Sequence, residues 1–277
     1  MYQPSEKAQQ IIEAISGFVR NEILPLEQQA GLSWAEPHPR AVLQQVWQRS
    51  CEQGFYNIML PEAIGGAGLS VSDLCAVKEA TVLTGSMLAP HILGELSGPP
   101  RLGHLFKVAS PTQIEAFLQP VCRAEKAVCF ALTESEAGSD ATAIKTSARR
   151  EGEHYVLNGT KRYISGAPYA DIAVLLAVTD PGRGAQGISA FFIDLSAPGV
   201  RVESDYSVMS GGGAHGDIIL EDVRVPAANR IGEQGQGFKL AMGRITLNRL
   251  LHCPTLLGLA GLALNLSIDY ARTRKQF

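Results

Sequence analysis

The sequence predicts an α+β protein in three parts, because the spacing of its apolar residues changes twice along the chain. In residues 1–126, apolar side chains recur at steps of three and four, as in amphipathic helices. Residues 127–235 contain short β-prone runs separated by Gly, Asn, Asp and Pro. Helical spacing returns in residues 236–277. We therefore expect an all-helical N-terminal domain, a middle β-barrel or sandwich-like domain, and the first long helix of a C-terminal helical bundle.

The N-terminal part is expected to be almost entirely helical. Ser5 can cap the first helix, and Gly54 can end the second in a left-handed conformation. Gly98-Pro-Pro100 should interrupt the fourth. The expected helices cover residues 5–29, 41–54, 71–84, 87–106 and 111–118.

The middle part is expected to form a compact β domain. Asn158-Gly159 is typical of a two-residue hairpin turn, because both residues tolerate positive φ. The expected strands cover residues 128–132, 146–150, 154–157, 161–164, 172–178, 188–194, 200–203, 217–225 and 230–231.

In the last part, the helical spacing of the apolar residues predicts one long helix from Gly237 onward. Pro254 should bend or locally open it, because proline lacks the amide donor and crowds the preceding turn. The sequence stops at Phe277, where the helical region has barely begun.

Composition is that of an ordinary soluble protein. The 277 residues are 45% apolar, which is enough for two domain cores. The net charge of -3 disfavours a nucleic-acid or anionic-membrane binder. The five cysteines form no Cys-x-x-Cys pair, so no metal site is expected. No secretory or transit signal and no apolar run of about 18 residues are recognised, so a cytoplasmic location is expected.

Residues 130–140 and 158–165 are the stretches most suggestive of a binding site. The hydroxyls of Thr133 and Ser139 and the small-residue turn at Gly138 can serve a flat polar ring with a phosphate tail, such as a flavin. The alternative is a β-hairpin rim in which these residues serve only the turn.

Several linked motifs resemble the acyl-CoA dehydrogenase family, and the resemblance covers nearly the whole chain. The turn residues Ser135 and Glu136 stand where the family usually has Pro and Gly. The matching segments are residues 132–140, 144–146, 155–161, 163–165, 54–61, 65–69, 235–243 and 270–277.

The resemblance implies an FAD enzyme that oxidises acyl-CoA thioesters to trans-2-enoyl-CoA and passes electrons to an electron-transferring flavoprotein. A glutamate removes the α-proton while the β-hydrogen leaves as hydride. The family also implies a homodimer or homotetramer with FAD sites shared across subunits. By analogy, residues 71–84 and 89–96 would line the acyl pocket, whose preferred chain length the sequence does not reveal.

The resemblance also assigns roles to individual residues. Thr133 would donate to the flavin pyrimidine edge, Tyr163 would cover the ring, and Ser165 would face N5. Ser139 would reach the cofactor pyrophosphate or the CoA arm, and Arg249 the CoA arm. The residues expected to bind FAD are Phe130, Leu132, Thr133, Gly138, Ser139, Tyr163, Ile164, Ser165, Arg274, Gln276 and Phe277, the last three across a subunit interface.

No catalytic base is recognised in these residues. In some branches of the family the glutamate stands where this chain has Asn248, which cannot abstract a proton. The base is therefore expected beyond Phe277. Glu134 is interpreted as a structural support of its loop. Two other hypotheses stay open: an FAD-dependent oxidase or monooxygenase on the same fold, and a truncated chain that acts as a binding or assembly module.

Overall fold

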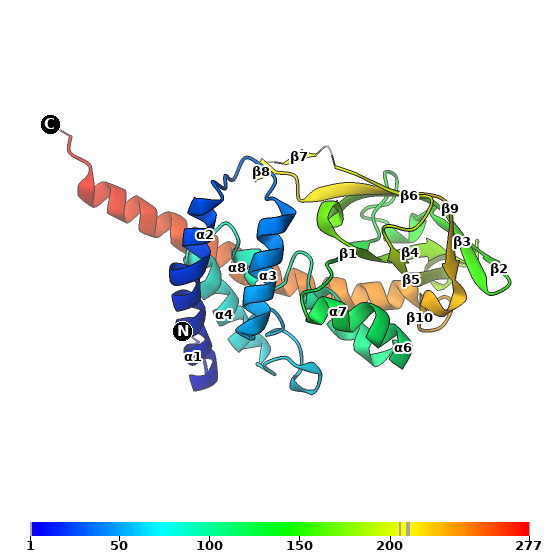
Figure 1. Ribbon diagram of the computed structural model, residues 1–277, viewed down its shortest axis with the longest axis horizontal. Coiled ribbons are helices and arrows are strands. Elements are labelled where there is room, and N and C mark those ends of the chain that lie inside the picture. The colour runs from blue at the N-terminus through cyan, green and yellow to red at the C-terminus, as the bar shows by residue number, and fades with distance from the viewer. Residues whose placement is uncertain (1, 205, 209–210, 277) are drawn as a thin grey trace.

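The computed structural model describes residues 2–204, 206–208 and 211–276, and it has the expected α+β architecture (Figure 1). Helices fill the chain up to Cys122, strands lie between Val128 and Ile231, and one long helix, α8 (Gly237–Thr273), follows. α8 runs along both the helical part and the sheet (Figure 1), and it packs against α4 (Val71–Leu83) and β5 (Ile188–Asp194).

The N-terminal helices enclose a core around Trp47, which is fully buried. The predicted first helix is present but divided by a π-helical turn, Val19–Ile23, and the Ser5 hydroxyl caps it by accepting from the Ala8 amide at 3.2 Å. Besides α4, the helices are α1 (Glu6–Phe18), α2 (Leu24–Gln29), α3 (Arg40–Glu52), α5 (Ala89–Ile92), α6 (Pro111–Gln113) and α7 (Gln119–Cys122).

The helical region predicted over residues 87–106 is wrong in its extent, whereas its predicted interruption at Gly98-Pro-Pro100 is confirmed. Only the single turn of α5 is α-helical, and two 3₁₀ segments, Pro99–Arg101 and Gly103–Lys107, follow it. Two consecutive prolines, Pro99 and Pro100, have no amide donors for an α-helical ladder, so the chain turns tightly instead. This turn places Arg101 against the β domain, where it takes part in the site described below.

The described middle residues form an eight-stranded, mainly antiparallel sheet. Its order is β10-β5-β4-β2-β3-β9-β6, and β1 pairs in parallel with β4. The separate pair β7 (Ser207–Val208) and β8 (Gly211–Gly212) lies outside it. The other strands are β1 (Val128–Ala131), β2 (Ser147–Glu151), β3 (His154–Ser165), β4 (Ile172–Val178), β6 (Val200–Glu203), β9 (His215–Pro226) and β10 (Arg230–Ile231).

The hairpin turn predicted at Asn158-Gly159 is also wrong, because β3 runs through both residues without a break. They form a bulge against β9, where the Asn158 side chain donates to Asp222 Oδ1 at 3.0 Å and accepts from its amide at 2.9 Å. Gly159 is required here by its φ of 146° and because a Cβ would lie 2.6 Å from Thr146 Oγ1. The conformational freedom of Asn158-Gly159, which suggested a turn, instead allows a bulge within β3.

α8 passes through Pro254 as one helix. Contrary to the sequence expectation, it is long and apolar enough to cross a membrane, with a mean hydropathy of 1.5 over its most apolar window. One such helix is weak evidence for a membrane, since the core helix of a helical bundle has the same composition. Only 17% of that window is buried here, and several leucines of its second half are exposed.

Candidate active site

A cavity of about 290 Å³ lies where β1 and β3 meet α8, and it brings the two suggestive stretches together. Phe130, Leu132 and Thr133 line one side, and the end of β3 brings in Tyr163 and Ser165 with Ile164 between them. The Arg162 amide donates to the Thr133 carbonyl at 2.8 Å, which ties the first stretch (residues 130–140) to the second (residues 158–165). Six predicted flavin contacts therefore share one cavity.

A buried ion pair fixes the segment that carries Thr133. The Lys161 ammonium, fully buried, lies 2.7 Å from Glu134 Oε1 and 3.0 Å from the Leu132 carbonyl. Glu134 also accepts from the Lys145 amide at 2.7 Å and from the Thr146 amide and hydroxyl at 3.0 and 2.5 Å. Burial lowers the pKa of Lys161 to about 8, although Glu134 opposes this shift. The geometry supports a structural role for Glu134.

Tyr163 is held in a strained conformation on the cavity wall. Its φ of 59° is left-handed, which is uncommon for a bulky residue and is typical of functional sites. Its amide donates to Asp217 Oδ1 at 3.2 Å, and its ring lies 5.0 Å from the Tyr206 ring. The Arg162 guanidinium, which pairs with Asp217 at 3.0 Å, lies 5.2 Å from the Tyr163 ring centroid. The ring nevertheless remains 53% exposed.

α8 supplies the opposite wall. The Arg244 guanidinium carbon lies 4.1 Å from the Phe130 ring centroid, a cation–π contact. One turn further, Asn248 is hydrogen-bonded to His252 at 3.0 Å, and both side chains line the cavity. Burial is the main reason that the pKa of His252 is lowered, and the charges of Lys78, Arg101 and Arg244 lower it further. His252 is therefore favoured in its neutral form.

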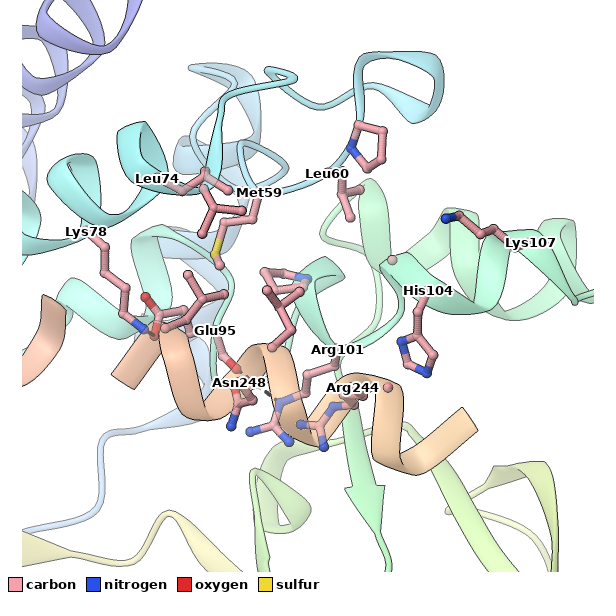
Figure 2. A pocket seen from close by; sticks show the side chains of 17 residues that line it. Met59, Leu60, Leu74, Lys78, Glu95, Arg101, His104, Lys107, Arg244 and Asn248 are labelled. Carbon is pink, nitrogen blue, oxygen red and sulfur yellow. Dashed lines mark hydrogen bonds and ion pairs between the residues drawn. The ribbon is translucent and has the colours of Figure 1, made fainter. Parts of the chain in front are cut away.

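A second cavity, of about 320 Å³, adjoins the first between α4, the 3₁₀ segments and α8 (Figure 2). Glu95, Arg101, Arg244 and Asn248 line both cavities. Most of the remaining wall is apolar and includes Met59, Leu60, Val71, Leu74, Leu247 and Leu251. The two segments expected to line an acyl pocket, residues 71–84 and 89–96, do contribute here, through Val71, Leu74, Lys78 and Glu95.

Buried charges lie at the boundary of the cavities. Lys78 and Glu95 form an ion pair of 2.7 Å, with side chains 4% and 19% exposed. Arg101 Nε donates to the Glu95 carbonyl at 3.1 Å. Burial, and then the charge of the nearby Arg101, lower the pKa of Arg244 to about 9. Burial, and then the charge of Arg244, lower the pKa of His104 to about 4. At neutral pH, His104 is therefore uncharged and Arg244 is charged.

Other predicted site residues lie away from these cavities. Ser139 and Gly138 are exposed in the turn after Glu134, and Arg249 is exposed on α8 without lining either cavity. Arg274 and Gln276 lie past the free end of α8 (Figure 1). His252 is the last residue of α8 that lines either cavity, and the 22 residues from it to Arg274 (274 − 252) span about 33 Å of helix, so this chain's own Arg274 cannot reach the cavity. Phe277 lies outside the described residues.

Arg101 and Arg244 are site residues that were not expected from the sequence, and Glu95 was expected only as part of the segment 89–96. The available signal was charge at otherwise apolar positions: Glu95 and Arg101 interrupt a segment rich in Leu, Gly and Pro. Arg244 is three residues from Ala241, on the face of α8 that is buried against the protein. A charged residue on a buried helical face is unusual, so Arg244 is a candidate site residue.

Comparisons with known proteins match every part of this architecture. The acyl-CoA dehydrogenase family profiles match in order: the N-terminal domain over residues 5–125, the middle domain over 129–223 and the C-terminal domain over 235–277. A putative acyl-CoA dehydrogenase from Mycobacterium abscessus superposes with a TM-score of 0.85 at 28% identity, covering 100% of this chain and 72% of that one.

Two curated relatives are similar in sequence. The CarC subunit of the caffeyl-CoA reductase–Etf complex of Acetobacterium woodii is 38% identical over 84% of this chain and 62% of its own length. The 3-(aryl)acrylate reductase of Clostridium sporogenes is 34% identical over 99% of this chain and 71% of its own. The chain thus spans about two thirds of the length of these relatives. By its profiles, its fold and these relatives, the chain belongs to the acyl-CoA dehydrogenase family.

Proposed function

We propose that the chain binds FAD against β1 and β3 and takes part in the α,β-dehydrogenation of an acyl-CoA thioester to the trans-2-enoyl-CoA. We further propose that an electron-transferring flavoprotein accepts the electrons. The single cavity that combines Phe130, Thr133, Tyr163 and Ser165 with the face of α8 carries this proposal. Its apolar neighbour provides space for an acyl chain.

The residues of the cavity fit a flavin ring. Phe130 and Leu132 offer an apolar wall, and Tyr163 a half-exposed aromatic face. Among the described residues, the hydroxyls of Thr133 and Ser165 have no side-chain hydrogen-bond partner, so both are free to bind the polar edge of a ring. About 290 Å³ is the lower end of the range for ligand sites, which suits the ring alone. When bound, FAD supplies the hydride acceptor.

The chain's own residues would position the substrate and exclude water from it. The Met59, Leu74 and Leu247 side chains would hold the acyl chain in an apolar environment, where hydrogen bonds to the thioester oxygen are strong. Glu95 is the one carboxylate that lines the cavities within the described residues, and its ion pair with Lys78 makes it a counter-ion. We propose that the base is a glutamate from another segment, as the resemblance implies.

The position of Arg274 supports a shared cofactor site. About 33 Å of α8 separates it from His252, the nearest α8 residue that lines the cavity of its own chain. We propose a homodimer or homotetramer in which Arg274 and Gln276 contact the FAD of a second subunit. The planar guanidinium of arginine suits paired contacts with phosphate oxygens.

Reduction of an enoyl-CoA is a second candidate, because two of the relatives are named as reductases. Both directions use the same cavity and differ in which ligand gives or takes the hydride. Anaerobic spectroscopy of the flavin-loaded protein separates them. A dehydrogenase loses the visible absorbance of oxidised flavin on addition of saturated acyl-CoA. A reductase regains that absorbance when its reduced form meets enoyl-CoA. Rapid oxygen consumption with acyl-CoA would favour an oxidase, and no spectral change with a broad acyl-CoA panel would contradict the proposal.

Tyr163→Ala is expected to weaken FAD binding about tenfold to a hundredfold, because the ring loses an aromatic face worth about 1–3 kcal/mol. Fluorescence titration with FAD measures the change. Tyr2→Ala is the matched control, since Tyr2 is 54% exposed, close to the 53% of Tyr163, and lies in the N-terminal part. Equal FAD affinity of the Tyr163→Ala variant and the wild type would place the flavin elsewhere.

A further inference from the structure

Two arginines, the buried Arg101 and the half-buried Arg244, face the boundary between the cavities. Arg101 is 8% exposed, and its Nη atoms have no hydrogen-bond or ion-pair partner among the described residues. Arg244 likewise has no ion-pair partner among the residues that the structure describes, and its guanidinium packs on the Phe130 ring. Figure 2 shows the two guanidinium groups beside each other and pointing the same way. Both side chains line both cavities.

The surroundings do not neutralise these charges. Glu95 is the one carboxylate among the described lining residues, and Lys78 already pairs with it. His104 is uncharged at neutral pH, and Asn248 and His252 bring no negative charge. Glu95 also attracts Arg101. Among the described lining residues, three cations at the boundary, Lys78, Arg101 and Arg244, therefore share this single carboxylate, which leaves an excess of positive charge.

Such an arrangement is unfavourable in the absence of a ligand. Buried charges are normally paired, and two like charges at close range repel each other. A guanidinium, by contrast, binds a carboxylate strongly through two parallel hydrogen bonds. An anionic group placed between the arginines would pair both charges. A neutral chain passing the same point would leave both of them desolvated and unpaired.

We propose that Arg101 and Arg244 bind a carboxylate on the acyl group of the substrate, and that the protein acts on short acyl-CoA thioesters carrying a second acid group. This inference rests on the proposed function. The position of the two arginines indicates that the anion they bind is on the acyl group and is not one of the CoA phosphates. The arginines lie between the cavity lined by Tyr163 and Ser165 and the apolar cavity lined by Leu74 and Leu247, on the path assigned to the acyl chain.

Calorimetric titration of the full-length, FAD-loaded protein tests this pairing by binding alone. Each member of a series of short ω-carboxyacyl-CoA thioesters is compared with its ω-carboxamide, which has the same shape and no charge. The wild type should bind at least one carboxylate about tenfold or more tightly than its amide. Arg244→Met and Arg101→Met should each remove most of this preference, and Arg244→Lys should keep part of it.

Lys239→Met is the control for long-range charge, because Lys239 is an exposed lysine on α8 that lines neither cavity. It should change the carboxylate-to-amide ratio by less than about twofold. Thermal unfolding shows whether each variant folds. If Arg101→Met does not fold, Arg244→Met is sufficient for the test, because Arg244 is only half-buried.

Equal binding of acid and amide by the wild type would overturn the inference and leave the proposed function intact. The inference would also be overturned if the ratio of carboxylate to amide affinity were unchanged in both arginine variants. That result is expected if the two arginines stabilise the negative charge of a reduced flavin. Failure to bind any acyl-CoA would overturn the proposed function, and this inference with it.

Discussion

Glu134→Ala is expected to lower the free energy of unfolding by about 3–5 kcal/mol, because it leaves the Lys161 ammonium buried without a counter-ion. The Lys161 side chain is fully buried, and only the Leu132 carbonyl, at 3.0 Å, would still accept from it. The Lys145 and Thr146 amides would also lose their acceptor. Urea denaturation followed by fluorescence measures the loss.

Two further variants isolate the ion pair. Glu134→Ala combined with Lys161→Met should recover much of the loss, since methionine fills the space without a charge. Glu151→Ala removes an acid that pairs with the exposed Arg149 at 2.6 Å, and it should cost less than about 1 kcal/mol. A Glu134→Ala protein within 1 kcal/mol of the wild type would show that the pair does not stabilise this segment.

Acidification is expected to destabilise the helical part through His91. Burial, and then the charge of His38, lower its pKa to about 3 from an ordinary value of 6.5. The Trp47 indole donates to His91 Nδ1 at 3.3 Å, which requires that nitrogen to be unprotonated. Between pH 6.5 and about 3 the unfolded chain binds a proton that the folded chain excludes. Stability therefore falls with falling pH, by about 1.4 kcal/mol per unit.

The His91→Phe variant should lack this component. From pH 6.5 to 4.5, the wild type should lose about 2.3 kcal/mol more than the variant, because half of the unfolded chains are already protonated at His91 at pH 6.5. The comparison uses the change between two pH values, because the variant also loses the acceptor for Trp47 at every pH. Tyr169, whose ring lies 6.0 Å from His91, stays neutral over this range because burial raises its pKa to about 12. Equal pH slopes for the two proteins would contradict a buried neutral His91.

Periodicity was enough to predict the three-part architecture, because amphipathic helices and short strands expose their period directly in the sequence. Predictions from short sequence motifs were less accurate where tertiary contacts determine the local structure. Asn158-Gly159 has the composition of a turn, but pairing with β9 keeps it inside one strand. The segment after α5 has helical spacing, but Pro99 and Pro100 remove the donors that a helix needs.

The candidate site, too, could be predicted only in part from the sequence. Thr133, Tyr163 and Ser165 could be predicted, because they belong to motifs whose spacing is visible in the chain. The meeting of Arg101 and Arg244 could not, since it depends on how a proline turn and a distant helix pack together. The left-handed backbone of Tyr163 is likewise set by the bulge in β3 and the Asp217 contact, and neither has a signature in the sequence.

A crystal structure of the full-length protein grown with FAD would show directly where the flavin binds. We predict the flavin ring in the cavity between β1, β3 and α8, with Thr133 and Ser165 at its polar edge and Tyr163 against its face. A flavin bound at another surface, with this cavity still open, would contradict the proposed site.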